Sequence, residues 1–136
     1  MDENQVIWRE LRTKQNHLDL LDERNRSIRQ QREKQFDDLQ QKRDQLLHMM
    51  ESKFQMMQHT LGQVDVDTTE ERAQLNRIAS HFSQSVSMGF TRNQRTLEQR
   101  IENEEIEYRR ERRKLEDDID ILHRQKMKLD QEKRKG

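Results

Sequence analysis

Residues 101–129 read IENEEIEYRRERRKLEDDIDILHRQKMKL. Apolar residues recur at intervals of seven in this stretch, each among mostly charged side chains: Ile101, Tyr108, Leu115, Leu122 and Leu129. On an α-helix, one apolar residue in every seven forms a single narrow seam, which is buried only when another helix lies along it. This stretch therefore predicts a long helix that packs against a second helix.

The N-terminal half of the chain has the same organisation. Its apolar residues are separated by three, by four, or by sums of these steps: Ile7, Leu11, Leu18, Leu21, Ile28, Leu39, Leu46, Met49 and Met56. Charged residues make up 40% of the chain and hydrophobic residues 29%, which is too little apolar material for a compact globular core. The 27 basic and 27 acidic residues are interleaved, and there is no proline, so exposed helices are favoured over disorder.

The helical period is lost after Gly62. This glycine is well placed to end the first helix in a left-handed conformation. Either Thr68 with Glu71 or Asp67 with Glu70 forms a capping-box signal that begins the next helix. We therefore expect an all-α chain that forms a single domain over residues 1–136, with a helix over about 3–61, a turn over about 62–68 and a helix over about 69–133.

A short turn returns the second helix antiparallel to the first, which gives a long coiled-coil-like helical hairpin. Folding about residue 65 places Leu21 near Tyr108 and Met50 near Phe82, and the polar layers of the two helices coincide as well. Gly89 lies in a serine-rich stretch of low helix propensity, so the second helix is either continuous or kinked or broken there. A break would allow residues 91–136 to fold back as a third helix.

Near the turn, apolar residues spread over two faces of each helix instead of one seam. A two-helix hairpin buries one stripe per helix, so the surplus stays exposed unless a partner helix, or the third helix of a broken hairpin, covers it. We expect a helical protein partner to bind here, at Leu46, Leu47, Met49, Met50, Phe54, Met57, Leu61, Ile78, Phe82, Val86 and Phe90. At the opposite end, Trp8 either packs beside Ile7 and Leu11 or, if exposed, marks a further contact.

Residue types needed for chemistry are absent or unsuitably spaced. There is no cysteine, nucleophile elbow, phosphate loop or Rossmann motif, so we expect neither an enzyme nor a cofactor. His48 and His81 can approach each other across the hairpin, but no third metal ligand has the required helical spacing. The zero net charge argues against a nucleic-acid partner, and no segment approaches the ~18 apolar residues that indicate a membrane span.

Three stretches carry a resemblance to a known family: IASHFS at residues 78–83, RTLEQR at 95–100 and RRKLEDD at 112–118. Over roughly residues 30–130 the layout resembles the small helical partner proteins encoded beside LXG toxins of type VIIb secretion systems. Such proteins are short, free of cysteine and intensely charged, with a phenylalanine-bearing middle followed by a long Leu- and Glu-rich helix. The resemblance implies a chaperone or targeting factor that binds the helical N-terminal domain of a toxin, with or without a second small helical partner.

Two further functions fit the same pattern. The chain also looks like the charged hairpins that form stalk-like components of flagellar and type III export ATPases, and a self-associating coiled-coil structural protein would show the same seams. The acidic N-terminal residues lead straight into a polar helix and carry no signal-peptide pattern. We therefore expect a cytoplasmic location, with export alongside the partner left open.

Overall fold

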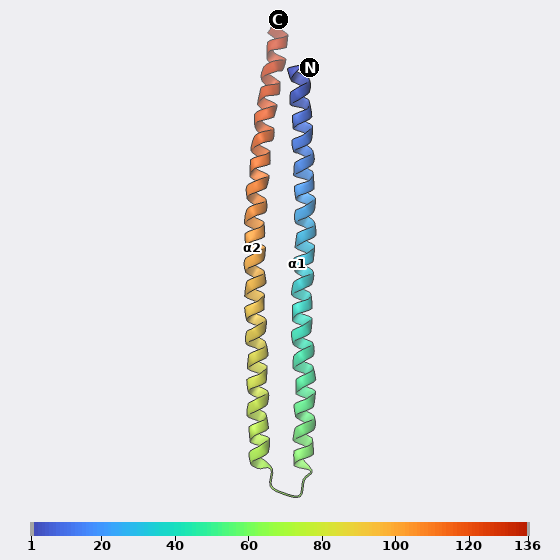
Figure 1. The fold of residues 1–136 in the computed structure, drawn as a ribbon, viewed down its shortest axis with the longest axis vertical. Coiled ribbons are helices and arrows are strands. Elements are labelled where there is room, and N and C mark those ends of the chain that lie inside the picture. Colours follow the sequence, from blue (N-terminus) through green and yellow to red (C-terminus); the bar gives the residue numbers. More distant parts are fainter. Residues whose placement is uncertain (1, 136) are drawn as a thin grey trace. The chain divides into compact units, whose positions relative to one another are not determined.

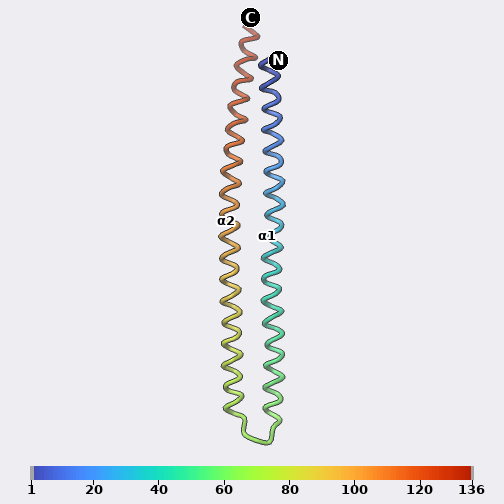
Figure 2. Tube along the Cα trace, viewed as in Figure 1, coloured from blue at the N-terminus to red at the C-terminus, as the bar shows by residue number. Residues whose placement is uncertain are grey.

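A computed structural model describes residues 2–135, which form two α-helices joined by one loop (Figure 1). α1 spans Glu3–Gly62 and α2 spans Thr69–Lys135. The helices run antiparallel and side by side, so the expected all-α helical hairpin is confirmed (Figure 2). By contacts the described residues form two compact units. Unit 1 takes residues 2–31 and 100–135, and unit 2 takes residues 32–99.

α2 is continuous through Gly89, so neither the kink-or-break alternative nor a third helix over residues 91–136 is found. A Cβ atom added at Gly89 would meet no atom within 4 Å, and the backbone there has an ordinary negative φ. Nothing forces a glycine at this position. The helix continues because one glycine costs only about 1 kcal/mol, which its long neighbouring helical segments readily offset.

The loop ends α1 by a different route from the one expected. No glycine among the described residues has a positive φ, so the prediction of a left-handed cap at Gly62 is wrong. Instead, the Thr68 hydroxyl donates to the carbonyl oxygen of Leu61 at 2.8 Å, and the Gln63 N–H donates to that of Thr60 at 3.2 Å. These bonds satisfy two carbonyl groups at the helix end, and Thr68 is buried as a result.

Asp67 organises the start of α2. Its Oδ1 accepts hydrogen bonds from the Thr69 hydroxyl at 2.6 Å and from the Thr69 N–H at 3.0 Å. These bonds hold the pKa of the Asp67 carboxyl below its usual value, with the hydroxyl making the larger contribution. The ionised carboxylate also lies at the positive end of the helix dipole. Neither expected capping box forms among the described residues: the Asp67 carboxylate binds Thr69 in place of Glu70, and the Thr68 hydroxyl serves α1.

Unit 1 is closed by apolar and charged contacts between its two helices. Leu18 of α1 and Ile119 and Leu122 of α2 are buried in its seam. Lys14 forms an ion pair with Asp118 at 3.2 Å, and Arg29 donates to both carboxylate oxygens of Glu105 at 2.9 and 3.0 Å. These contacts fix the pairing of α1 and α2 in the register expected from a fold near residue 65.

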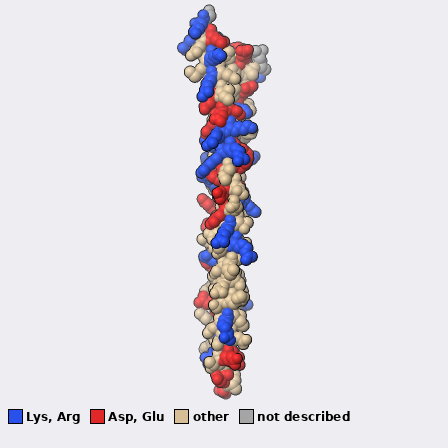
Figure 3. Space-filling view, turned by 90° about the vertical axis from the view of Figure 1, so that its left-hand side faces the viewer, with Lys and Arg blue, Asp and Glu red and all other residues tan. Residues whose placement is uncertain are grey.

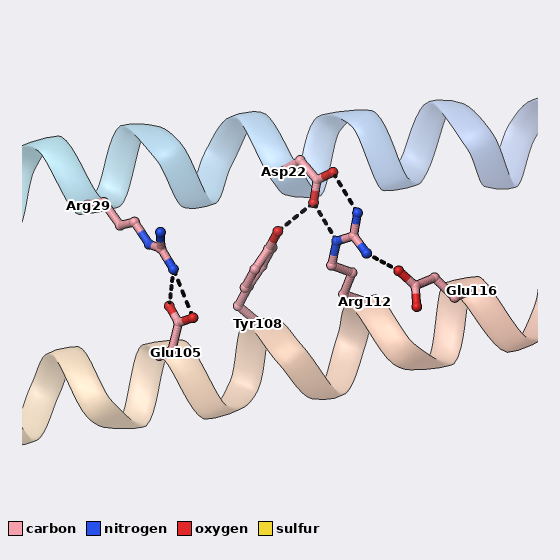
Figure 4. Close-up of polar contacts among 6 residues, drawn as sticks. All are labelled: Asp22, Arg29, Glu105, Tyr108, Arg112 and Glu116. Carbon is pink, nitrogen blue, oxygen red and sulfur yellow. Dashed lines mark hydrogen bonds and ion pairs between the residues drawn. The ribbon is translucent and has the colours of Figure 1, made fainter.

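A polar layer crosses the seam of unit 1 (Figure 4). The Tyr108 hydroxyl donates to Asp22 Oδ1 at 2.6 Å, and Arg112 Nε donates to the same oxygen at 3.1 Å. Arg112 also pairs with Glu116 on its own helix. The Tyr108 bond, followed by that of Arg112, lowers the pKa of Asp22, and the carboxylate in turn raises the pKa of Tyr108. Because a slip of one residue would leave these groups unpaired, this layer selects one register.

Candidate partner-binding surface

Unit 2 has a seam between its helices, but the seam is shallow. No apolar side chain in residues 32–99 is buried. Among the expected partner-binding residues, one group is half-buried along this seam: Leu47, Met50, Phe54 and Leu61 on α1 and Phe82, Val86 and Phe90 on α2. The ring of Phe90 is covered by the Arg43 guanidinium, 4.3 Å from the ring centroid. The structure thus places these residues in contacts that hold the hairpin together.

A second group of the expected residues lies outside the seam and is exposed. Leu46, Met49, Met57 and Ile78 retain 39%, 49%, 50% and 55% of their accessible surface. Met56, which the sequence-based list omits, is more exposed than any of them, at 70%. Leu46, Met49 and Met56 follow the helical spacing expected of the seam. The prediction that these three residues lie in the seam is wrong, because they are exposed. Leu47, Met50 and Phe54 lie in the seam instead.

These exposed residues gather on one side of the hairpin in unit 2. A groove there lies between α1 and α2, and its apolar lining comes from Met56, Met57 and Leu61 on α1 and from Leu75 and Ile78 on α2. Leu46 and Met49 continue the same face along α1, since they lie seven and four residues before Lys53, which also lines the groove. We call this surface the apolar face, made of Leu46, Met49, Met56, Met57 and Ile78.

On the opposite side of unit 2 the large apolar side chains that line the groove are half-buried and the exposed residues are polar. This groove has the seam residues as its floor, but Glu51, Gln55 and Gln58 of α1 and Asn76 and Ser83 of α2 form its edges. Gln58 Nε2 donates to the side chain of Asn76 at 2.8 Å and to the carbonyl oxygen of Arg72 at 3.0 Å. These groups are satisfied by one another and by solvent. We call this surface the polar side.

The two units also differ in how many charged residues cover their surfaces. On the side that Figure 3 shows, Lys, Arg, Asp and Glu crowd together over the part of the hairpin farther from the loop, and uncharged residues dominate a stretch nearer the loop. The loop adds exposed apolar surface through Val64 and Val66, at 49% and 68%. The exposed apolar residues of the apolar face therefore make unit 2 the clearest candidate for a binding site.

Other candidates from the sequence give weaker sites. Trp8 is 55% exposed, and the Lys126 ammonium lies 5.4 Å from its ring centroid, so the ring is partly covered within unit 1. His48 and His81, the two histidines expected to approach each other, are both exposed. Within residues 2–135, no group of three or more His, Cys, Asp or Glu side chains is arranged to hold a metal ion. Neither helix has an apolar stretch long enough to cross a membrane in the described part of the chain.

Comparisons with protein families, curated proteins and solved structures found no match to this chain. The function is therefore inferred from the surface geometry, with the resemblance in layout as a guide to the partner.

Proposed function

We propose that this chain is a non-catalytic helical adaptor that binds a helical segment of another protein through the apolar face of unit 2. The observation that carries the proposal is the exposure of five large apolar side chains on one face, two of them methionines adjacent at positions 56 and 57. Full burial of one such side chain contributes about 1.5–3 kcal/mol, so even partial burial of five provides a favourable association energy. Methionine side chains also adapt their shape to a partner surface.

The resemblance in layout supports a specific partner, the helical N-terminal domain of an LXG toxin. In this proposal the chain acts in the cytoplasm as a chaperone or targeting factor before type VII secretion, alone or with a second small helical protein. A long helical domain is a suitable ligand because it can lay its own apolar seam along the apolar face. Covering that face would also prevent the association that exposed methionines otherwise promote.

Co-expression tests this function directly. The helical N-terminal domain of an LXG toxin is produced with and without the chain, and the products are separated by size-exclusion chromatography with light scattering. We expect the two proteins to elute as one complex of defined mass and the toxin domain to be less soluble alone. Separate elution of two soluble proteins contradicts the proposal. A stable dimer or tetramer of the chain that ignores the toxin domain favours a self-associating structural protein instead.

A further inference from the structure

We infer that the apolar face receives one amphipathic helix of a different chain, with a carboxylate where that helix passes Lys53 and a cation where it passes Glu71, while the polar side stays in contact with water. This inference rests on the proposed function and specifies the face, the number of helices and the charges of the partner. Its basis is the shape and charge of a single groove.

The walls of the groove fit a helix. Met56 and Met57 come from α1 and Ile78 comes from α2, so an incoming helix would contact both helices at once, as the third member of a helical bundle. A second helix on the polar side would have to remove water from Glu51, Gln55 and Asn76, which costs free energy unless each group gains a new partner. One helix on the apolar face is therefore the favoured arrangement.

The rims of the groove carry opposite charges. Lys53 lies on the α1 rim and Glu71 on the α2 rim, and neither forms an ion pair with another residue of the described chain. Glu70 adds a second carboxylate in the first turn of α2. A partner helix with acidic side chains on one flank of its apolar seam and basic side chains on the other matches both rims.

A second copy of this chain does not match these rims. In a twofold arrangement that places α1 against α1, the basic rim meets itself. In the other, α1 lies against α2 of the second copy with both loops at the same end. The bond between Gln58 and Asn76 sets the level of the helices, so Lys53 would then meet residues near His81, about 15 Å from Glu71. Neither arrangement pairs Lys53 with Glu71, so charge favours a different chain.

The absence of cysteine allows a matched experiment on adjacent positions. Met56→Cys places a thiol on the apolar face, and Gln55→Cys places one on the polar side of the same helix turn. Both side chains are exposed in the hairpin. The rate of labelling by a maleimide is measured for each variant alone and with the toxin domain. We expect the complex to slow labelling at Met56→Cys by about tenfold or more and to change that at Gln55→Cys by less than about twofold.

Charge variants test the partner chemistry in the same complex. Lys53→Glu and Glu71→Lys should each weaken binding of the toxin domain by about two- to fivefold at low salt, whereas Glu51→Lys on the polar side should leave the affinity unchanged. Met56→Glu should weaken binding by about 100-fold, with Gln55→Glu as its control. Circular dichroism checks that each variant keeps its helix content.

The outcomes separate this inference from the proposed function. If no complex forms with the unaltered chain, the adaptor function fails and the inference fails with it. If the complex forms but protects Gln55→Cys and leaves Met56→Cys reactive, the adaptor function stands and the assignment of the face is overturned. Protection of Met56→Cys in the isolated chain at rising protein concentration would show that a second copy occupies the face, which also overturns the inference.

Discussion

The two units use the same pair of helices in different ways. Unit 1 buries Leu18, Ile119 and Leu122 and ties its helices together through Asp22 and Tyr108, whereas unit 2 buries no apolar side chain. Both units expose large apolar side chains, in unit 1 at Val6, Trp8, Leu20, Ile106, Ile121 and Met127, but unit 2 gathers five of its own on the apolar face. One apolar seam is sufficient to hold the two helices of a hairpin in register. Polar side chains beside the seam keep the rest of the hairpin surface solvated. Apolar residues beyond the seam add nothing to the hairpin itself and indicate a surface for association.

The largest expected effect on the free energy of unfolding comes from a substitution in the seam of unit 1. Leu122→Ala removes a side chain that is only 7% exposed, and we expect the free energy of unfolding to fall by about 2 kcal/mol. Leu47→Ala in the half-buried seam of unit 2 should cost about half as much, because less surface is returned to water. Urea denaturation followed by circular dichroism measures both losses. Equal losses at the two positions would contradict the difference in burial between the units.

The polar layer of unit 1 predicts a dependence of stability on pH. The folded state lowers the pKa of Asp22, so its carboxylate contributes stability that is complete above about pH 4 and is lost as the pH falls through the lowered pKa. Asp22→Asn should cost about 1 kcal/mol at neutral pH and flatten this acid dependence. Thermal unfolding between pH 7 and pH 2 provides the measurement.

Tyr108→Phe is the control for the acid dependence. It removes the hydrogen bond that makes the largest contribution to lowering the pKa of Asp22, so the acid-dependent loss of stability should be smaller in total and should end at a higher pH than in the unaltered chain. The raised pKa of Tyr108 makes its own contribution full below about pH 10, and that contribution is lost as the pH rises through the raised pKa. An unchanged acid limb in both variants would show that the layer does not couple to folding.

Most of the hairpin follows from sequence because its determinants are local or periodic. The seven-residue spacing of Leu115, Leu122 and Leu129 identifies the seam, and the missing period after Gly62 locates the loop. The contact of Tyr108 with Asp22 agrees with the register obtained by folding the chain near residue 65. The way in which α1 ends was not predictable in the same way. It depends on the hydroxyl of Thr68, which donates to the carbonyl oxygen of Leu61, seven residues earlier in the chain.

The candidate site was only partly predictable. Sequence places the surplus of apolar residues near the loop, but it does not say which of them pack in the seam. Phe54 and Phe82 are the larger side chains and lie in the seam, whereas the flexible Met56 is left on the surface. Which face of each helix is buried depends on the rotation of that helix about its own axis relative to its partner, and the spacing of residues alone does not determine this rotation.

A smaller effect tests the continuity of α2 in unit 2. Gly89→Ala should raise the free energy of unfolding by about 0.5–1 kcal/mol, because alanine loses less backbone entropy and its Cβ meets no neighbour within 4 Å. Gly62→Ala, at the last residue of α1, is the comparison: its Cβ would lie 3.8 Å from the Arg72 guanidinium, an ordinary contact. A loss of stability at either position would indicate that the glycine needs a conformation that alanine cannot adopt.

The smallest expected change in stability sharpens the comparison most. Met56→Gln replaces a side chain that is 70% exposed and contacts little in the hairpin, so the free energy of unfolding should stay within about 0.5 kcal/mol of the unaltered chain. The same substitution removes apolar surface that a partner helix would bury, so it should weaken the complex with the toxin domain. Leu122→Ala should have the opposite effect. It should lower the free energy of unfolding, while the folded chain keeps its affinity for the toxin domain. If Met56→Gln instead destabilises the hairpin as strongly as Leu122→Ala, Met56 is a structural residue, and the distinction between a closed unit 1 and an open unit 2 does not hold.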